Sequence, residues 1–345
     1  MTDSSRILFH AEINKLIADP NRDNFFRVDH NTVAVSDGSL SKRILAARPL
    51  HDFERTVFKP IAGRPIRKDI STAVMRAVNL DIRDALARDD LQTMPMTGIW
   101  PRDGHRFLQR LLYGGDPWNI RLLSHWSLQK SDALNRLLDF VVGRQTWRAA
   151  GNRESALAGV LRAIAAHDEK RIAVALYRRA ASAVCSTVSV LITHALWLGS
   201  PFDGGTNIRN AILETLRLLP PAWMYLRTAG SEYHALDARI GDGDDILLIP
   251  FLTHRDPNVW ENAESFVPER WWGIDEPEAL DSYLPFGHAD DRCWARKIML
   301  LFSERILEEV VRRNLHRDPA QRVVRIPKGQ LLAIDKLRVI GGRPV

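Results

Sequence analysis

The stretch Leu284-Pro-Phe-Gly-His-Ala-Asp-Asp-Arg-Cys-Trp-Ala-Arg296 decides the fold of this chain. Its turn-forming residues deliver a single cysteine, Cys293, to the start of a segment whose apolar residues recur at helical spacing. A helix N-terminus is expected to favour the thiolate, because free backbone N–H groups and the helix dipole stabilise negative charge. Such a thiolate can bind a soft metal or a haem iron, although a lone cysteine is more commonly a small buried hydrophobe.

The composition is that of an ordinary globular protein of 345 residues with a net charge of +6. This charge suggests an acidic partner or substrate and is too diffuse to indicate nucleic-acid binding. Two cysteines do not make a disulfide framework, and the first residues show neither a signal pattern nor a membrane anchor, so we expect a cytoplasmic protein. The apolar run Ala180–Leu198 is long enough to cross a membrane, but its interruption by hydroxyl groups favours a buried central helix.

Hydrophobic periodicity predicts a mainly α fold with a small β portion, in one domain over residues 1–345. Alternating apolar residues between Phe25 and Val35 predict a β-hairpin, and Ser36 or Asp37 is expected to cap the helix that follows. The helices are expected at 11–18, 37–45, 70–88, 103–113, 122–128, 132–142, 154–167, around 180–198, 207–219 and from Cys293 to 313. Strands are expected within 222–249 and 323–339, and loops at 91–100 and 253–283.

Two further patterns precede the cysteine stretch. Glu214 and Arg217 lie three residues apart in a predicted helix, where they share a face and can pair, as many solvated surface pairs also do. The loop that follows Asp256 then presents Pro268-Glu269-Arg270.

In this order, Glu-x-x-Arg, Arg-Asp-Pro…Phe-x-Pro-Glu-Arg-Trp and Pro-Phe-Gly…Arg-Cys-x-Ala, the chain resembles the cytochrome P450 family of haem-thiolate enzymes. The resemblance implies a P450-like fold, haem b as the cofactor and Cys293 as the proximal iron ligand. It also implies that Glu214, Arg217 and Arg270 form a buried charge triad behind the haem. Such a triad is costly to desolvate, so it needs nearly complete hydrogen bonding, and its role is to fix the cysteine loop.

Further residues match the family's haem contacts. Phe286 would shield the thiolate, and Ala295 would let the helix approach the porphyrin. The implied partners of the haem propionates are Arg227, His105, Arg110 and Arg292. The alternatives are a charge at a strand edge for Arg227 and a solvated helix face for His105 and Arg110.

The sequence departs from the family pattern beside the cysteine. Asp291 stands where the family places a basic propionate partner, and a carboxylate about 5 Å from another costs roughly 3 kcal/mol at an effective dielectric near 20. We therefore expect Asp291 to point away, with Asp290 or Asp291 capping the next helix. Ala289 replaces a usual glycine, which makes the geometry of the turn uncertain.

The central helix departs further. The family's distal helix carries a small residue, an acid and a threonine that deliver protons to oxygen, and this helix has no acid near Ala181, Val184 and Cys185. We predict that Ser186 or Thr187 takes the catalytic role by bonding back to a helix carbonyl and holding a water. The alternative is ordinary packing of small residues. The short interval before Glu214 also predicts trimmed lid helices over the distal pocket.

The leading hypothesis is a soluble, bacterial-type monooxygenase that oxidises a small organic substrate, expected to belong to a natural-product pathway, with O2. Its electrons would come from an acidic ferredoxin-like partner on the basic face carrying Arg106, Arg110, Arg296 and Lys297. A second hypothesis is a P450-fold peroxygenase, dehydratase or isomerase that needs no external reductant, and a third is a haem-free accessory protein. The predicted substrate contacts are Met94, Met96, Ala181, Cys185, Trp223, Met224 and Tyr225.

Overall fold

The structure is a computed structural model, and it describes residues 6–17, 23–47, 60–61, 63–87, 90–93, 95–113, 148–149 and 153–341. The helices predicted at 122–128 and 132–142 lie outside the described residues, and so does Met94.

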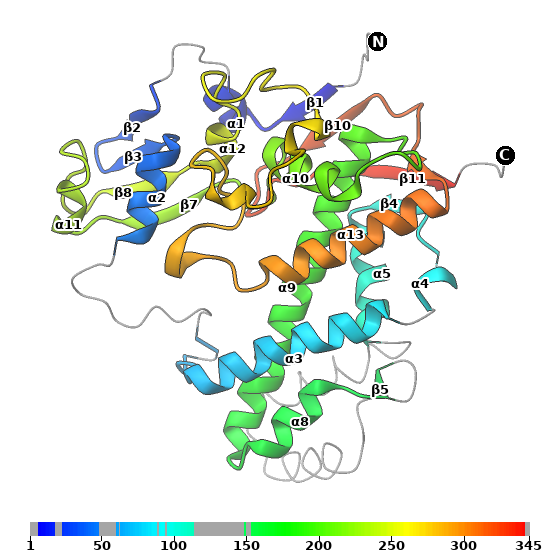
Figure 1. Cartoon of the computed structure of the whole chain (residues 1–345). Helices are drawn as coiled ribbons and strands as arrows, with labels where there is room; N and C mark the ends of the chain where they lie inside the picture. The colour runs from blue at the N-terminus through cyan, green and yellow to red at the C-terminus, as the bar shows by residue number, and fades with distance from the viewer. Residues whose placement is uncertain are drawn as a thin grey trace.

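A long helix, α9 (His167–Gly199), runs through the middle of the molecule (Figure 1). Helices α3, α5, α8, α10 and α13 all contact it. By length and composition α9 could cross a membrane, but 72% of its most apolar window is buried inside the protein. It is therefore the core helix that the interrupted apolar run predicts.

The remaining helices pack around α9 or lie beside the sheets, and most of the predicted ones are confirmed. Their bounds are α1 (Ala11–Ile17), α2 (Gly38–Ala46), α3 (Lys68–Leu86), α4 (Asp90–Thr93), α5 (Arg102–Tyr113), α8 (Ala156–Ala163), α10 (Ile208–Leu218), α11 (Ser231–His234), α12 (Pro250–Thr253) and α13 (Arg296–Arg312). Short 3-10 turns follow as η1 (Pro268–Trp271), η2 (Pro277–Ala279) and η3 (Ala289–Asp291). Asp37 caps α2 as predicted, because its carboxylate accepts a hydrogen bond from Leu40 N at 2.6 Å.

Two sheets are built from strands that are far apart in the sequence. The first has the order β2-β3-β8-β7, from β2 (Phe25–Asp29), β3 (Thr32–Val35), β8 (Asp245–Leu248) and β7 (Tyr225–Thr228). The second has the order β4-β11-β9, from β4 (Gly98–Trp100), β11 (Leu337–Gly341) and β9 (Leu315–Arg317). Two pairs complete the β portion: β1 (Arg6–Phe9) with β10 (Val323–Ile326), and β5 (Arg148–Ala149) with β6 (Arg153–Glu154).

The first sheet joins β7, the strand that carries Arg227, to the hairpin through β8. Strand β8 pairs in parallel with β3, so that Val35 lies opposite Leu248, and β7 then pairs antiparallel with β8. The predicted β-hairpin is confirmed, and this pairing puts Arg227 on the strand at the edge of the sheet.

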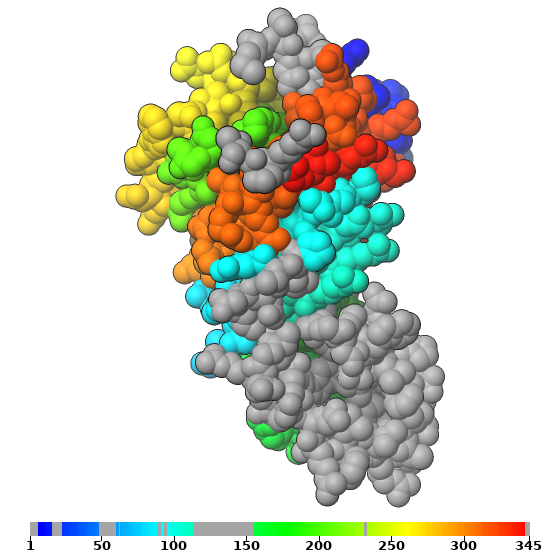
Figure 2. Space-filling model, turned by 90° about the vertical axis from the view of Figure 1, so that its right-hand side faces the viewer, coloured from blue at the N-terminus to red at the C-terminus, as the bar shows by residue number. Residues whose placement is uncertain are grey.

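The segment 91–100 is not the plain loop that we predicted. It contains the end of α4 and the strand β4, which pairs with β11 through Trp100 and Leu337. A three-residue strand has too little periodicity to be recognised, and its partner lies more than 230 residues away in the sequence. Figure 2 shows the surface of β4 and α5 directly beside the C-terminal strand.

Candidate active site

The cysteine loop is a tight structure that closes on itself. Cys293 N donates a 2.8 Å hydrogen bond to the carbonyl oxygen of Phe286, across the 3-10 turn η3. Gly287 has φ +72°, and a Cβ there would lie 2.7 Å from the carbonyl oxygen of Asp291. Ala289 adopts φ +49°, a region that favours glycine. The turn in which Ala289 replaces a usual glycine is thus formed with this alanine in the left-handed conformation.

The Cys293 thiol lies two residues before Ala295, the N-cap of α13. The backbone N–H groups of Ala295 and Arg296 favour its thiolate form, but burial has the larger effect and raises the pKa of the thiol. Our prediction of a net lowered pKa is therefore wrong. The two backbone N–H groups nevertheless offer hydrogen bonds to the sulfur, and these would favour a thiolate if the sulfur held a metal.

The triad behind this loop is assembled as predicted. Glu214 and Arg217 are both fully buried. The Arg217 guanidinium donates twice to Glu214 and also to the carbonyl oxygens of three loop residues, His254, Ala263 and Ser265. All five N–H groups of Arg217 therefore have an acceptor, which is the condition under which a buried charge is tolerated.

The Glu214 carboxylate is equally well satisfied. Besides Arg217 it accepts hydrogen bonds from Arg270 Nε, Val267 N and Trp271 Nε1, each at 3.0 Å. Sequence reasoning missed Val267 and Trp271, although Trp271 directly follows Arg270 in the quoted motif. The network joins α10 to η1, so the helix and the loop before the cysteine are held together.

A buried histidine links this network to the cysteine loop. The His254 carbonyl accepts from Arg217, and its Nε2 accepts a 2.8 Å hydrogen bond from Leu284 N, where the cysteine stretch begins. Burial lowers the pKa of His254 to about 3, so the ring is neutral and can accept that hydrogen bond. The sequence analysis did not select His254, which follows the α12 segment and precedes the Arg-Asp-Pro motif.

Arg227 extends from β7 to the cysteine loop, and there it meets Asp291. Its Nη2 lies 2.7 Å from Asp291 Oδ2, and its Nε donates to the same oxygen at 3.2 Å. Asp291 thus faces the arginine that was expected to hold a propionate, and the expectation that it points away from that propionate stays a prediction. The capping role is wrong, because α13 begins at Arg296 and its N-cap residue, Ala295, makes no side-chain cap.

The other predicted haem contacts fall into two groups. Phe286 and Ala295 are buried beside Cys293, and Arg292 lies 3.8 Å from Glu278, which also pairs with Arg296. Helix α5, which carries His105 and Arg110, packs against α9, β4 and α3.

The central helix presents a small accessible stretch. Thr187 Oγ1 donates a 2.9 Å hydrogen bond to the carbonyl oxygen of Ala183, which is the back-bonding that we predicted for Ser186 or Thr187. Ser186 and Thr187 are half-buried and Ala183 is exposed, whereas Val184 and Cys185 between them are buried. Ala183, which was not predicted, supplies the carbonyl that accepts this hydrogen bond, and its spacing of four from Thr187 was the available signal.

Most predicted substrate contacts face the core. Ala181, Cys185 and Met96 are at most 2% exposed, and burial raises the pKa of the Cys185 thiol to about 12. Trp223 is buried, Met224 is 41% exposed, and the Tyr225 hydroxyl donates to the carbonyl oxygen of Leu284 at 3.0 Å. Tyr225 therefore contacts the cysteine loop.

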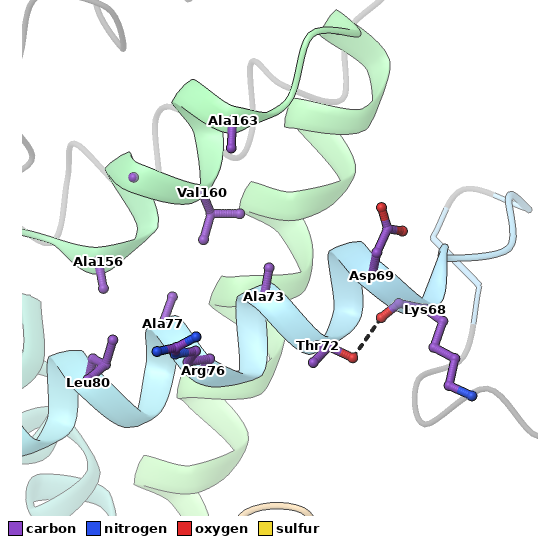
Figure 3. A pocket seen from close by; sticks show the side chains of 11 residues that line it. Lys68, Asp69, Thr72, Ala73, Arg76, Ala77, Leu80, Ala156, Val160 and Ala163 are labelled. Carbon is purple, nitrogen blue, oxygen red and sulfur yellow. Dashed lines mark hydrogen bonds between the residues drawn. The ribbon is translucent and has the colours of Figure 1, made fainter.

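A separate groove of about 890 Å³ lies between α3 and α8 (Figure 3). It owes its width to small side chains, among them Ala73, Ala77, Ala156 and Gly159. None of the predicted substrate contacts that the structure describes lines this groove.

Comparisons with known proteins agree with this geometry. The family model described as cytochrome P450 matches residues 208–327. Cyclooctatin synthase of Streptomyces melanosporofaciens is 38% identical over 81 residues, which are 23% of this chain and 18% of that protein. The match thus spans about a fifth of the length of this relative.

Solved structures extend the likeness to the whole chain. A mutant of P450 EryK in complex with erythromycin B superimposes with a TM-score of 0.60 at 19% identity, covering 96% of both chains. A six-coordinated cytochrome P450 from Thermus thermophilus gives a TM-score of 0.56 at 18% identity, covering 97% of this chain and 99% of that one. At these identities the likeness concerns the fold.

Proposed function

Because residues 208–327 belong to the cytochrome P450 family and the chain has the fold of that family, we propose that it is a haem-thiolate monooxygenase. In this proposal Cys293 would ligate the iron of haem b, a cofactor that would supply the chemistry of O2 activation, and the substrate would be a small organic molecule of a natural-product pathway. The observation that carries the proposal is the Cys293 sulfur itself, half-buried at the end of a closed loop with two backbone N–H donors.

The residues of this chain have distinct tasks in the proposal. Glu214, Arg217 and Arg270 would hold the helix and loop that precede the cysteine stretch, and the buried Phe286 would close the loop through its carbonyl, which accepts from Cys293 N. On α9, the hydroxyl groups of Ser186 and Thr187 would hold a water and supply a proton to the reaction. Ala181 and Cys185 are assigned to helix packing, because both are fully buried.

Electrons are proposed to arrive from an acidic ferredoxin-like protein in the cytoplasm. Lys297 is exposed in the first turn of α13, close to Cys293 in sequence. Arg296 beside it forms an ion pair with Glu278, with 3.4 Å between Arg296 Nε and Glu278 Oε2. Arg106 and Arg110 lie on α5, which packs against α9 and β4, so we assign the docking contact to the N-terminal end of α13, which directly follows Cys293.

The test is the absorption spectrum of the reduced, CO-bound protein. A Soret band of the thiolate type in the wild type, and its loss in Cys293→Ser, would support the proposal. An unchanged band in Cys293→Ser would reject Cys293 as the ligand, and a wild type that takes up no haem would favour the accessory-protein alternative.

One observation favours a second candidate function. After Asp168 and Glu169 in its first turn, α9 carries no acid up to Gly199. A distal helix without a carboxylate suits an enzyme that works without external reductant, as a peroxygenase, dehydratase or isomerase. Turnover in the absence of any reductase would favour this candidate, and strict dependence on reduced ferredoxin would exclude it.

A further inference from the structure

The Arg227–Asp291 pair uses most of the hydrogen-bonding capacity of the arginine. Nε and Nη2 are directed to Asp291 Oδ2, and Nη1 donates to the carbonyl oxygen of Leu226 at 2.7 Å. Both side chains are more than four-fifths buried, so solvent screens the pair only partly. These bonds use three of the five N–H groups and leave one on each Nη, so a second carboxylate at this end of the guanidinium would lie beside the charge of Asp291 and the Leu226 carbonyl.

The same face of β7 is tied to the loop at a second point. Tyr225 lies two residues before Arg227, so both side chains project from one face of the strand. The Tyr225 hydroxyl bonds to Leu284 and Arg227 pairs with Asp291, which attaches the strand to both ends of the turn that carries the cysteine. The loop is therefore tied to β7 by the carboxylate of Asp291 and by the Leu284 carbonyl.

We infer that Asp291 competes with a haem propionate for Arg227 and thereby weakens the retention of haem. The inference rests on the proposed function, because it concerns the cofactor that Cys293 would ligate. Asp291 is in this view a positioning residue: it satisfies Arg227 when haem is absent and repels the propionate when haem is present. The pair would stabilise the cysteine loop of the haem-free protein, and the protein would bind haem less tightly than it would without Asp291.

The experiment compares wild type, Asp291→Asn and the control Asp281→Asn. Asp281 lies ten residues earlier and pairs with Lys42 at 3.1 Å, so its replacement removes the same charge without touching Arg227. The haem is transferred to an excess of apomyoglobin, and the dissociation rate is read from the Soret change. We expect Asp291→Asn to lose haem about tenfold more slowly, because a charged competitor of the propionate is gone, and Asp281→Asn to match wild type.

A second readout uses the apo protein alone. The melting temperatures of wild type, Asp291→Asn, Arg227→Gln and the double variant form a double-mutant cycle. We expect the two single replacements to lower the melting temperature and the double replacement to lower it by less than their sum. A cycle without coupling would show that the pair does not hold the loop, and it would overturn the inference.

The outcomes separate this inference from the proposed function. If wild type binds haem and Asp291→Asn releases it at the same rate or faster, the inference is overturned while haem binding stands. If only Asp291→Asn takes up haem, the competition is supported in its strongest form. If neither protein takes up haem, the proposed function fails and the inference fails with it.

Discussion

Replacement of Glu214 by glutamine tests the buried triad most directly. The carboxylate is fully buried and accepts hydrogen bonds from Arg217, Arg270, Val267 and Trp271. Glutamine keeps the shape but removes the charge, and it turns an NH2 group toward these donors. Two arginines then lack their counter-charge in a site that solvent does not reach.

The magnitude follows from burial and chain length. Removing one partner of a buried ion pair costs about 3–5 kcal/mol, because the remaining charge stays unpaired. Unfolding entropy of about 2.1 cal/mol/K per residue gives roughly 0.7 kcal/mol/K for 345 residues, so the melting temperature should fall by about 4–7 °C.

The assay is thermal unfolding followed by circular dichroism, with Glu308→Gln as the matched control. Glu308 also pairs with an arginine three residues away, Arg305, at 2.5 Å, but both side chains are about half exposed. Exposed pairs contribute about 0–1 kcal/mol, so this variant should melt within about 1.5 °C of wild type. A Glu214→Gln protein that melts no lower than the Glu308→Gln protein would refute the reasoning.

Two further predictions concern acid stability and the cysteine turn. Burial lowers the pKa of His194 to about 4 and that of His254 to about 3, so below their unfolded pKa of about 6.5 the unfolded chain binds protons that the folded protein excludes. The free energy of unfolding should therefore be highest above pH 6.5 and fall as the pH is lowered toward 4 and 3. At pH 5 each histidine should lower it by about 2 kcal/mol relative to pH 7. Equal free energies of unfolding in urea at pH 5 and pH 7 would contradict this. Gly287→Ala should destabilise the protein by about 2 kcal/mol, because residue 287 has a positive φ and the new Cβ would meet a backbone oxygen. Ala289→Gly should be neutral or stabilising by up to about 1 kcal/mol, because residue 289 also has a positive φ. Melting curves that rank these two variants in the opposite order would argue against the turn geometry.

Local patterns explain why much of the fold could be predicted. The hairpin, the central helix and the helix after the cysteine each carry a periodicity that depends on neighbouring residues alone. Strand β4 could not be predicted, because three residues gain their structure from pairing with β11. The trimming of the lid helices stays a prediction, since residues 114–147 lie outside the described part of the chain.

The site divides in the same way. Glu214 and Arg217 could be paired from the sequence because their spacing places them on one helix face. The orientation of Asp291 depends on Arg227, which lies 64 residues earlier and reaches the loop only through the order of the sheet. The pKa of Cys293 was predicted in the wrong direction because the helix-end effect is local, whereas burial depends on the whole fold.

The burial profile of α9 has a consequence for motion. The ten residues 188–197 are all buried, while Arg178, Arg179 and Ala183 in the earlier turns are exposed. Backbone amides in the buried third are expected to exchange with solvent only when the whole protein unfolds, whereas the earlier turns can open locally. The C-terminal part of the helix is thus the more rigid, and the earlier turns open more easily. Local opening that admits a small molecule toward Thr187 should begin in these earlier turns.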